Sequence, residues 1–323
     1  MNCTRRLTLA LVATLALATP AAFAQAFPSK PVKLIVNFPP GGAADVIGRA
    51  LATQLAEQLK QQVVVENRPG ANGNIGADAV AKSPADGYTL LMSSGGAMTV
   101  NPFLYTRMPF DAEKDLVPVA SVARVLVFLV THPSLPVASM AELVAYAKAN
   151  PGKLSYGSPG TGSSPHLAAE MFRRQVQFEA THVPYKGAAP ALTDLLAGQL
   201  QFMFDPGPGL RHVKDGKLRL LAVGSPRRSS QVPDTPTLAE LGVTGFDADT
   251  TFGIYAPGGT PAALVGQLHE EINKAIASAR VQEVVKSIGG EPAAQSRADF
   301  IAAQNRDRDR FGAFIKEAGL KVE

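Results

Sequence analysis

The sequence is poor in cysteine and in aromatic residues. Its 323 residues include one cysteine, no tryptophan and only 7% aromatic residues. The single Cys3 precedes an apolar N-terminal segment that we expect to be removed as a signal peptide. The mature chain would then hold no thiol, which excludes disulfides, zinc–thiolate sites and cysteine nucleophiles. A lipoprotein anchor is disfavoured as well, because a lipidated cysteine would follow the apolar segment.

The chain also has little excess of charge. Removing Arg5 and Arg6 with the signal leaves 29 basic against 27 acidic residues, a net charge of +2. The basic residues are scattered, and the one local pair, Arg227-Arg228, has no aromatic neighbours of the kind that stack on bases. We therefore predict no nucleic-acid partner.

The first 24 residues have the three parts of a secretory signal peptide. Arg5 and Arg6 supply the charge, residues 7–18 are apolar, and the A-x-A sequence at 22–24 is a cleavage site. The apolar run is shorter than the roughly 20 residues of a membrane-spanning helix, which makes a membrane anchor the weaker interpretation. We expect cleavage after Ala24, a mature chain that begins at Gln25, and export of a soluble protein to the periplasm.

Strand and helix patterns alternate along the first third of the mature chain. Short apolar runs at 32–37, 63–65 and 88–92 predict strands, and apolar residues recur at helical spacing from Asp45 to Leu59. This order is typical of α/β proteins, in which helices cover both faces of a parallel sheet. A chain of 323 residues is long enough for two such domains.

The middle of the chain repeats this order. A capping box at Ser139 opens a helix to about residue 149, and a strand at 154–157 leads through a glycine-rich loop into a helix at 166–174. Shifting the sequence by 120 residues places Pro39 on Pro159 and Gly42 on Gly162. Two strand, loop and helix units at matching places predict two related lobes.

The last third is expected to return to the first lobe. A strand at 252–256 precedes a helix for which Thr260 is the expected N-cap and Pro261 the first residue. Two more helices follow, too few for a domain of their own. We therefore expect crossover strands near 123–130 and 250–255. The predicted lobes are residues 25–126 plus 248–323, and residues 127–247.

Two glycine-rich loops are candidates for binding an anion. Each places backbone N–H groups at a helix start, where they have no partner within the helix and lie at the positive end of its dipole. The first loop spans 38–45, and the alternative is an ordinary turn in which Asp45 or a water caps the helix. The second spans 158–166 and adds the hydroxyl groups of Thr161, Ser163 and Ser164.

The second loop also raises the alternative of a secreted serine hydrolase. His166 could act as a base for Ser163 or Ser164, or it could orient the loop from the first turn of its helix. No acid partner is evident, and the loop has neither a P-loop nor a G-x-S-x-G nucleophile elbow, so the orienting role is favoured. The other four histidines, His182 among them, are isolated, and none pairs at i, i+4 as metal ligands on a helix would. We predict no metal and no cofactor.

Two further segments could reach a ligand. Tyr185, Lys186 and Gly187 precede a predicted helix at 191–197, and Lys186 is either a ligand contact or a solvated side chain. Asp205 follows an apolar strand, where ligands meet α/β sheets, so we favour a ligand-facing role over that of a turn residue.

Several short motifs, taken together and in order, make the sequence resemble a known family. The chain is similar over its whole mature length to the extracytoplasmic solute receptors of the tripartite tricarboxylate transporter family, the TctC-like proteins called Bug receptors in Bordetella. The motifs are FPPGGAAD at 38–45, ENRPG at 66–70 with GNIG at 73–76, DGYTL at 86–90, residues 157–166, VPYKG at 183–187, and AP at 256–257 with TP at 260–261.

The resemblance implies a two-lobed α/β fold of the type II periplasmic binding protein kind, with two crossover strands. It implies a monomeric receptor, not an enzyme, that closes over a dicarboxylate, a tricarboxylate or an acidic amino acid. The partners would be the large and small membrane subunits of a transporter. A receptor that feeds a sensor kinase would use the same binding residues, so this alternative stays open.

The resemblance also implies which residues meet the ligand. The two glycine-rich loops hold the carboxylate, a loop at 94–98 lines the cleft, and Asp205 matches an acidic position near the ligand's distal end. Thr250-Thr251 departs from the family, because many relatives carry an aromatic residue, often Trp, just before the Phe-Gly of this strand. The smaller side chain is expected to enlarge the cleft or to admit water there. The expected ligand-binding residues are Phe38, Gly41, Gly42, Ala43, Ala44, Asp45, Ser94, Gly95, Met98, Gly160, Thr161, Gly162, Ser163, Ser164, His166, Tyr185, Lys186, Gly187 and Asp205.

Overall fold

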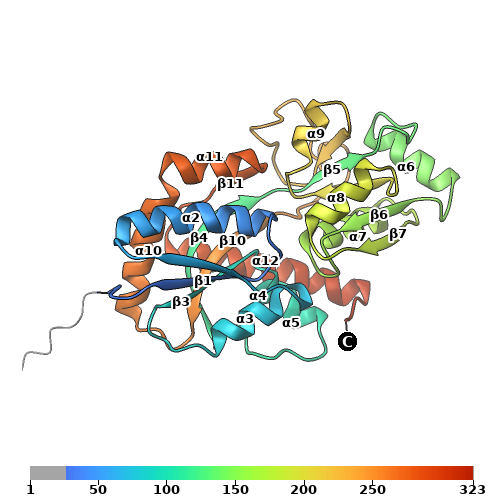
Figure 1. Ribbon diagram of the computed structural model, residues 1–323. Helices are drawn as coiled ribbons and strands as arrows, with labels where there is room; N and C mark the ends of the chain where they lie inside the picture. Colours follow the sequence, from blue (N-terminus) through green and yellow to red (C-terminus); the bar gives the residue numbers. More distant parts are fainter. Residues whose placement is uncertain (1–26, 323) are drawn as a thin grey trace, which may run out of the picture.

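The computed structural model describes residues 27–322, which form two α/β lobes, each built on its own sheet (Figure 1). The predicted signal peptide, its cleavage site and Cys3 lie outside the described residues. Within the described part of the chain, no helix is both long enough and apolar enough to cross a membrane.

The sheet of the first lobe has six strands in the order β11-β4-β10-β3-β1-β2. Strands β1, β2 and β3 are parallel, whereas β10 runs antiparallel to both β3 and β4. In β1 every residue except Lys33 is buried, as expected for a parallel strand covered by helices on both faces. The strands are β1 (Val32–Val36), β2 (Val63–Asn67), β3 (Thr89–Ser93), β4 (Leu116–Val125), β10 (Thr250–Pro257) and β11 (Gly290–Pro292).

The sheet of the second lobe has five strands in the order β7-β6-β8-β5-β9. Strand β6 is parallel to β7 and β8, and β5 is antiparallel to β8 and β9. The strands are β5 (Phe128–Thr131), β6 (Ser155–Ser158), β7 (Thr181–Pro184), β8 (Phe202–Asp205) and β9 (Arg219–Val223).

Helices cover both faces of each sheet, and each face has its own apolar core. On the first sheet α2, α10 and α11 pack on one face, and α3, α4 and α12 on the other; on the second sheet α6 and α7 oppose α8 and α9. The helices are α2 (Ala43–Leu59), η1 (Ala71–Gly73), α3 (Asn74–Ala81), α4 (Gly96–Thr99), α5 (Asn101–Leu104), α6 (Met140–Ala149), α7 (Ser164–Gln175), α8 (Ala188–Leu196), α9 (Leu210–Lys214), α10 (Ala262–Ile276), α11 (Ala279–Ser287) and α12 (Arg297–Ala318).

The chain passes between the lobes twice. It leaves the first sheet at the end of β4 and enters the second at β5, then returns from β9 to β10, close to the places expected from the sequence. In Figure 1 the green and yellow segments therefore form one lobe, and the blue, orange and red segments form the other. The exact lobe boundaries stay a prediction.

The two lobes touch each other beside the crossover strands. Leu167 of α7 packs in one apolar cluster with Phe311 and Ile315 of α12 and with Leu104 of α5. The side chain of Arg174 donates to the carbonyl of Ala318 at 3.0 Å. These contacts join α7 of the second lobe to α5 and α12 of the first.

Two expected helix starts are wrong. Helix α10 begins at Ala262 with Pro261 as its N-cap, because the Thr260 hydroxyl donates to the carbonyl of Pro257 in the preceding turn and does not cap the helix. Helix α8 begins at Ala188, three residues before the expected position, so the residues after Gly187 belong to its first turn.

Candidate functional site

A cavity of about 80 Å³ lies between the two lobes. Loops from both lobes line it, and the crossover strands close it at one side through Val125 of β4 and Phe252 of β10. A second interlobe cavity of about 550 Å³ adjoins it and shares part of its wall. The residues common to both cavities are Phe38, Pro39, Pro159, Lys186 and Gly187.

Three helices begin at the smaller cavity. The first residues of α2, α7 and α8 all line it, together with their N-caps Gly42, Ser163 and Gly187. Over the described residues, none of these N-caps makes a side-chain cap hydrogen bond. The positive ends of three helix dipoles therefore meet at one place, with N–H groups available to a ligand.

Three of the helices that begin elsewhere have a side-chain cap. In α6, α11 and α12 the N-cap is a serine, Ser139, Ser278 and Ser296, and its side chain accepts a hydrogen bond from the backbone of the first turn. Such a cap stabilises a helix by about 1 kcal/mol. In the described part of the chain α3, α4, α5, α9 and α10 also lack such a cap. What distinguishes α2, α7 and α8 is that their starts converge on one cavity, where an anion can be held.

Asp45 fixes the first loop from behind. Its carboxylate accepts hydrogen bonds from the N–H of Gly41 at 2.9 Å, from Arg49 at 3.0 Å and from Asn67 at 2.9 Å. Burial alone would raise the pKa of Asp45, but these hydrogen bonds outweigh burial and lower the pKa. Asp45 is not among the residues that line the cavity, so it positions the loop and leaves the helix start open.

His166 fixes the second loop in a similar way. Its Nδ1 accepts a hydrogen bond from the N–H of Gly162 at 3.2 Å, and its ring lies 4.1 Å from that of His182 between centroids. Burial lowers the pKa of His166 to about 4 and that of His182 to about 3, so both rings are neutral at pH 7. The expectation that His182 is isolated is wrong in space, because β7 runs beside β6 and brings it under the loop.

The arrangement does not match a serine hydrolase. The Ser163 hydroxyl donates to the carbonyl of Gly160 at 2.7 Å, and within residues 27–322 no hydrogen bond joins His166 to Ser163 or Ser164. Glu170 lies one helical turn after His166, but no hydrogen bond joins the two in the described structure. Its carboxylate accepts from Tyr156 at 2.6 Å and from Arg173 at 2.6 Å.

The structure brings about half of the expected residues to the smaller cavity. Gly160, Thr161 and Tyr185 line only the larger cavity, and Tyr185 donates its hydroxyl to Asp194 at 2.6 Å. Those that line the smaller cavity are Phe38, Gly42, Ala43, Ala44, Ser94, Ser163, Ser164, Lys186 and Gly187. Those that line neither are Gly41, Asp45, Gly95, Met98, Gly162, His166 and Asp205.

Asp205 and Met98 are buried away from both cavities. Asp205 accepts hydrogen bonds from the N–H groups of Gly207 at 2.8 Å and Gly209 at 2.7 Å, which is the turn role considered as the alternative. Burial raises the pKa of Asp205 to about 6 despite these bonds. Met98 packs in the core between α4 and the first sheet.

The expected residues miss the apolar part of the lining. Val125 and Phe252 belong to the crossover strands, where a buried apolar residue in a strand gives no signal that it faces a cavity. Prolines are the other group, since they read as turn residues in a sequence. The prolines that line the cavity are Pro39, Pro40, Pro159, Pro165, Pro190 and Pro206.

A third cavity, of about 230 Å³, lies behind the crossover strands. Arg124 and Thr251 line it, whereas their neighbours Val125 and Phe252 line the cavity in front. Because successive side chains of a strand point to opposite faces, the two cavities lie on opposite sides of the same pair of strands.

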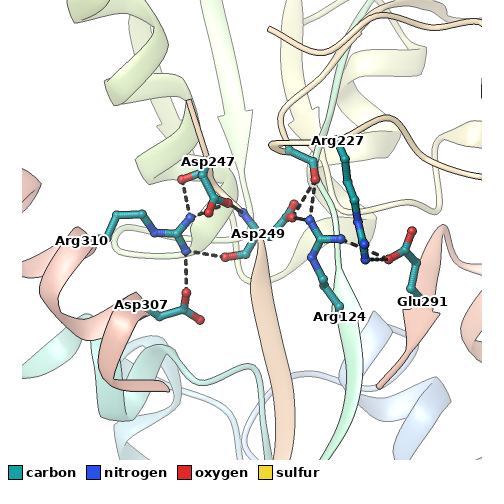
Figure 2. Close-up of polar contacts among 8 residues, drawn as sticks. Arg124, Arg227, Asp247, Asp249, Glu291, Asp307 and Arg310 are labelled. Carbon is teal, nitrogen blue, oxygen red and sulfur yellow. Dashed lines mark hydrogen bonds and ion pairs between the residues drawn. The ribbon is translucent and has the colours of Figure 1, made fainter. Parts of the chain in front are cut away.

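Ion pairs around this rear cavity join β4, β11, α12 and the segment that enters β10 (Figure 2). Arg124 pairs with Asp249 and with Glu291, and Arg310 of α12 pairs with Asp247 and Asp307. Figure 2 shows the two arginines on either side of the segment that enters β10. Burial raises the pKa of Asp249 to about 7 in spite of the neighbouring Arg124.

The position of Thr251 corrects an expectation. Its side chain lines the rear cavity and does not line the cavity between the three helix starts. A smaller residue at this place therefore enlarges the space behind the crossover strands and leaves the front cavity unchanged.

Comparisons with known proteins agree with this architecture. Residues 47–320 match the family model described as the tripartite tricarboxylate transporter family receptor, TctC. The chain belongs to this family. It is 40% identical over 331 residues to protein BugT of Bordetella pertussis, with all of both chains covered. It is 43% identical over 293 residues to a protein encoded between tcbD and tcbE in Pseudomonas sp. strain P51, covering 89% of this chain and 87% of that one.

Solved structures of this TctC and Bug type have the same fold. The R. palustris protein Rpa4515 with adipate is 36% identical, with a TM-score of 0.87 over 92% of this chain and 100% of that one. The periplasmic binding protein BugD is 31% identical, with a TM-score of 0.84 over 92% and 100%. MatC from Rhodopseudomonas palustris with bound malate is 26% identical, with a TM-score of 0.81 over 90% and 100%. The expected family and fold class are confirmed.

Proposed function

We propose that this chain is an exported receptor that captures a small organic acid between its lobes and delivers it to the membrane subunits of a tripartite tricarboxylate-type transporter. One observation carries the proposal: three helices begin at one interlobe cavity, and no side chain caps them in the described structure. Family membership supports it, as do the neighbours whose structures hold adipate and malate.

The geometry of the site suits binding of a carboxylate better than catalysis of a reaction. Helix-start N–H groups hold a carboxylate without a proton donor or nucleophile. The first lobe supplies α2, and the second supplies α7 and α8, so one carboxylate meets all three only when the lobes are together. We further propose that the lobes are residues 25–126 plus 248–323 and residues 127–247, with β4 and β10 as the hinge, and that the mature receptor is a monomer that begins at Gln25.

Ligand-dependent stabilisation tests this proposal. Protein purified from the periplasm is screened by thermal shift and calorimetry against mono-, di- and tricarboxylates, aromatic acids and acidic amino acids. At a ligand concentration 100 times Kd, a ligand of the folded state raises the free energy of unfolding by about 2.7 kcal/mol. An activated ester serves as the control for a hydrolase. Ester turnover that is lost in Ser163→Ala, with no shift from any acid, would contradict the receptor proposal.

Uptake separates a transport receptor from a receptor that feeds a sensor kinase. Cells that contain the neighbouring membrane subunits should accumulate the labelled ligand only when this receptor is present. Accumulation that does not depend on the receptor, in a strain where the receptor still binds the ligand, would favour the signalling role.

A further inference from the structure

We propose that His182 is a positioning residue for ligand capture. It acts through His166, which has to stay neutral to hold the second glycine-rich loop, so the affinity for a carboxylate falls when this pair of rings takes up a proton. The inference rests on the function proposed above, because it concerns the loop that presents the start of α7 to the cavity. Neither histidine lines the smaller or the larger interlobe cavity, so the pair acts from behind the binding site.

The hydrogen bond between His166 and the loop determines which form of the ring can be present. The N–H of Gly162 donates to Nδ1 of His166 at 3.2 Å, so this nitrogen carries a lone pair and the proton of the neutral ring lies on Nε2. A protonated ring carries N–H groups on both nitrogens and cannot accept this bond. Two donors would then face each other in a buried place, and we expect Gly162 to move away.

The residues that follow Gly162 form part of the wall of the smaller cavity. Ser163 is the N-cap of α7 and lines this cavity, as does Ser164, the first residue of the helix. His166 lies in the first turn of the same helix and is 4% exposed. Loss of its bond to the loop would therefore displace the start of α7, one of the three helix starts that converge on the cavity.

The ring of His182 covers the ring of His166. The two ring centroids lie 4.1 Å apart, and His182 also stacks on Tyr156 with 5.0 Å between centroids. Strand β7, which carries His182, is at the edge of the second sheet, and His182 is partly exposed whereas His166 is buried. Nε2 of His182 lies 2.7 Å from the hydroxyl group of Ser158, which fixes the ring in this position. His182 therefore keeps water away from one face of His166.

Charged groups of α7 also act on the pair. The carboxylate of Glu170 is already engaged, because Arg173 donates to both of its oxygens at 2.6 Å and Arg174 lies 3.5 Å from it. Burial is the main cause that lowers the pKa of His166 to about 4, while Glu170 raises this pKa and Arg173 lowers it. Burial also comes first for His182, whose pKa of about 3 is lowered further by charge on His166. Exclusion of water is thus the main reason that both rings are neutral.

The first glycine-rich loop does not depend on an imidazole. Its N–H at Gly41 donates to the carboxylate of Asp45, whose pKa is lowered because hydrogen bonds outweigh burial. From the first lobe, a Cβ on Gly162 would meet Leu104 and Asn72, neither of which carries a charge. A proton on the histidine pair therefore alters the second loop and leaves the first one as it is.

Two effects of such a proton on ligand affinity have opposite signs. Loss of the bond to the loop weakens binding, whereas the added positive charge would by itself attract an anion. We expect the loss of the loop to dominate, because it removes one of the three helix starts from the cavity. The direction of the change in affinity on acidification distinguishes the two effects.

Two variants at position 182 separate the ring from the rest of the side chain. His182→Phe keeps a ring over His166 and loses the contact to Ser158, whereas His182→Ala loses both. Nitrogen NMR spectroscopy of the histidine rings, recorded without ligand, reports the tautomer and the protonation of His166. We expect the Nε2–H tautomer at pH 7.5 in the parent and in both variants. In His182→Ala the pKa of His166 should rise toward its ordinary value of 6.5, and in His182→Phe it should change little.

Calorimetry with adipate, which the Rpa4515 structure holds, measures the consequence for binding. The acid with the largest thermal shift replaces adipate if adipate does not bind. The titration of the acid itself is the same for every protein, so we compare the ratio of Kd in a variant to Kd in the parent at each pH. For His182→Ala this ratio should grow about tenfold from pH 8 to pH 5, because the neutral fraction of His166 falls about tenfold per pH unit below its pKa. For His182→Phe the ratio should not depend on pH.

A substitution of His166 provides the rescue. In His166→Asn the side-chain carbonyl can accept from Gly162 and cannot take up a proton, so adding it to His182→Ala should remove the growth of the ratio in acid. His182→Gln, which has no ring, serves where His182→Ala does not fold.

Three outcomes would overturn the positioning role and leave the receptor function intact. They are an unchanged pKa of His166 in His182→Ala, a ratio that stays constant although this pKa has risen, and a ratio that falls in acid. The absence of binding by every acid of the screen would overturn the receptor function and this inference together.

Discussion

At the scale of single residues, the two loops are held by side chains that stand behind them. Asp45 accepts from the N–H of Gly41, and His166 accepts from the N–H of Gly162, each four residues earlier in the chain. The same arrangement thus recurs at an offset of 121 residues, although one loop uses a carboxylate and the other a neutral imidazole. In both, one loop amide is taken up by the protein and the following helix start is left open.

The two loop glycines differ in conformation, which yields the first prediction. Gly162 has φ +85°, and a Cβ there would clash with Leu104 and lie 2.9 Å from Asn72. Gly42 has φ −79°, and its Cβ would meet only the carbonyl of Pro39 at 3.5 Å. We expect Gly162→Ala to lower the free energy of unfolding by about 2 kcal/mol and Gly42→Ala to change it by less than about 1 kcal/mol.

The effect on ligand affinity should not follow the effect on stability at these two glycines. Gly42→Val keeps an allowed backbone but adds bulk beside the amides of α2, so we expect it to fold normally and to lose affinity. Denaturant unfolding and calorimetry on the same preparations separate the two effects. Equal stability of Gly162→Ala and the parent would show that the second loop relaxes without the contact to Asn72.

At the scale of elements, β4 and β10 carry the chain between the lobes and have a charged cluster on one side. Asp249 lies at the entry to β10 and bonds to Ser225 and to Arg124. One of its oxygens, Oδ1, is buried without a hydrogen-bond partner in the described structure. That oxygen accounts for the direction of its pKa, which burial raises to about 7.

The free energy of unfolding should depend on pH through Asp249. The folded-state pKa lies above the ordinary value of 3.8, so folding favours the protonated acid. Its contribution to stability is present below about pH 4 and is lost as the pH rises to about 7, with a magnitude of about 4 kcal/mol. We expect Asp249→Asn to flatten the fall in the free energy of unfolding between pH 5 and pH 8, measured with urea.

The comparison with the parent isolates Asp249 from other groups. Asp307 also has a raised pKa, of about 6, and remains in both proteins. The buried His166 and His182 act in the opposite sense, losing stability as the pH falls below about 6.5, and are likewise unchanged. Asp234→Asn, at an exposed position, is the matched control. An identical pH profile for Asp249→Asn and the parent would contradict the prediction.

Elements were largely predictable from the sequence, and contacts between distant segments were not. Hydrophobic spacing found β1, α2, β6 and α7, because it reflects burial along one element. The role of Asp205 as a turn residue depends on the loop after β8, and the pairing of His166 with His182 depends on which strands are neighbours. Neither is encoded in local spacing. The apolar part of the cavity lining was missed for the same reason, since Val125 and Phe252 look like any core residue of a strand.

At the scale of the whole molecule, the structure describes the lobes in contact. Leu167 packs against Phe311 and Ile315, and a Cβ on Gly187 would lie 3.4 Å from Pro39 of the other lobe. The cavity of about 80 Å³ lies beside these contacts, between the lobes. We expect the lobes to separate in the absence of ligand, and a ligand that binds both lobes to shift the equilibrium toward the closed form.

Solution scattering tests this closure. We expect the ligand-free protein to have a larger radius of gyration than the closed structure, and a saturating ligand to reduce it to the closed value while raising Tm. Leu167→Ala weakens the apolar contact between the lobes and should enlarge the ligand-free radius further. A ligand that raises Tm and leaves the scattering curve unchanged would show that the closed form is the resting state.

Bending of the two crossover strands would change the cavities on their two sides in opposite directions. A cavity lies on each side of them, with Val125 and Phe252 facing one and Arg124 and Thr251 facing the other. When a pair of strands bends, the residues on one face move apart and those on the opposite face move together. If the lobes open by bending these strands, the cavity in front widens while the polar cavity behind, lined by Arg124 and Thr251, narrows.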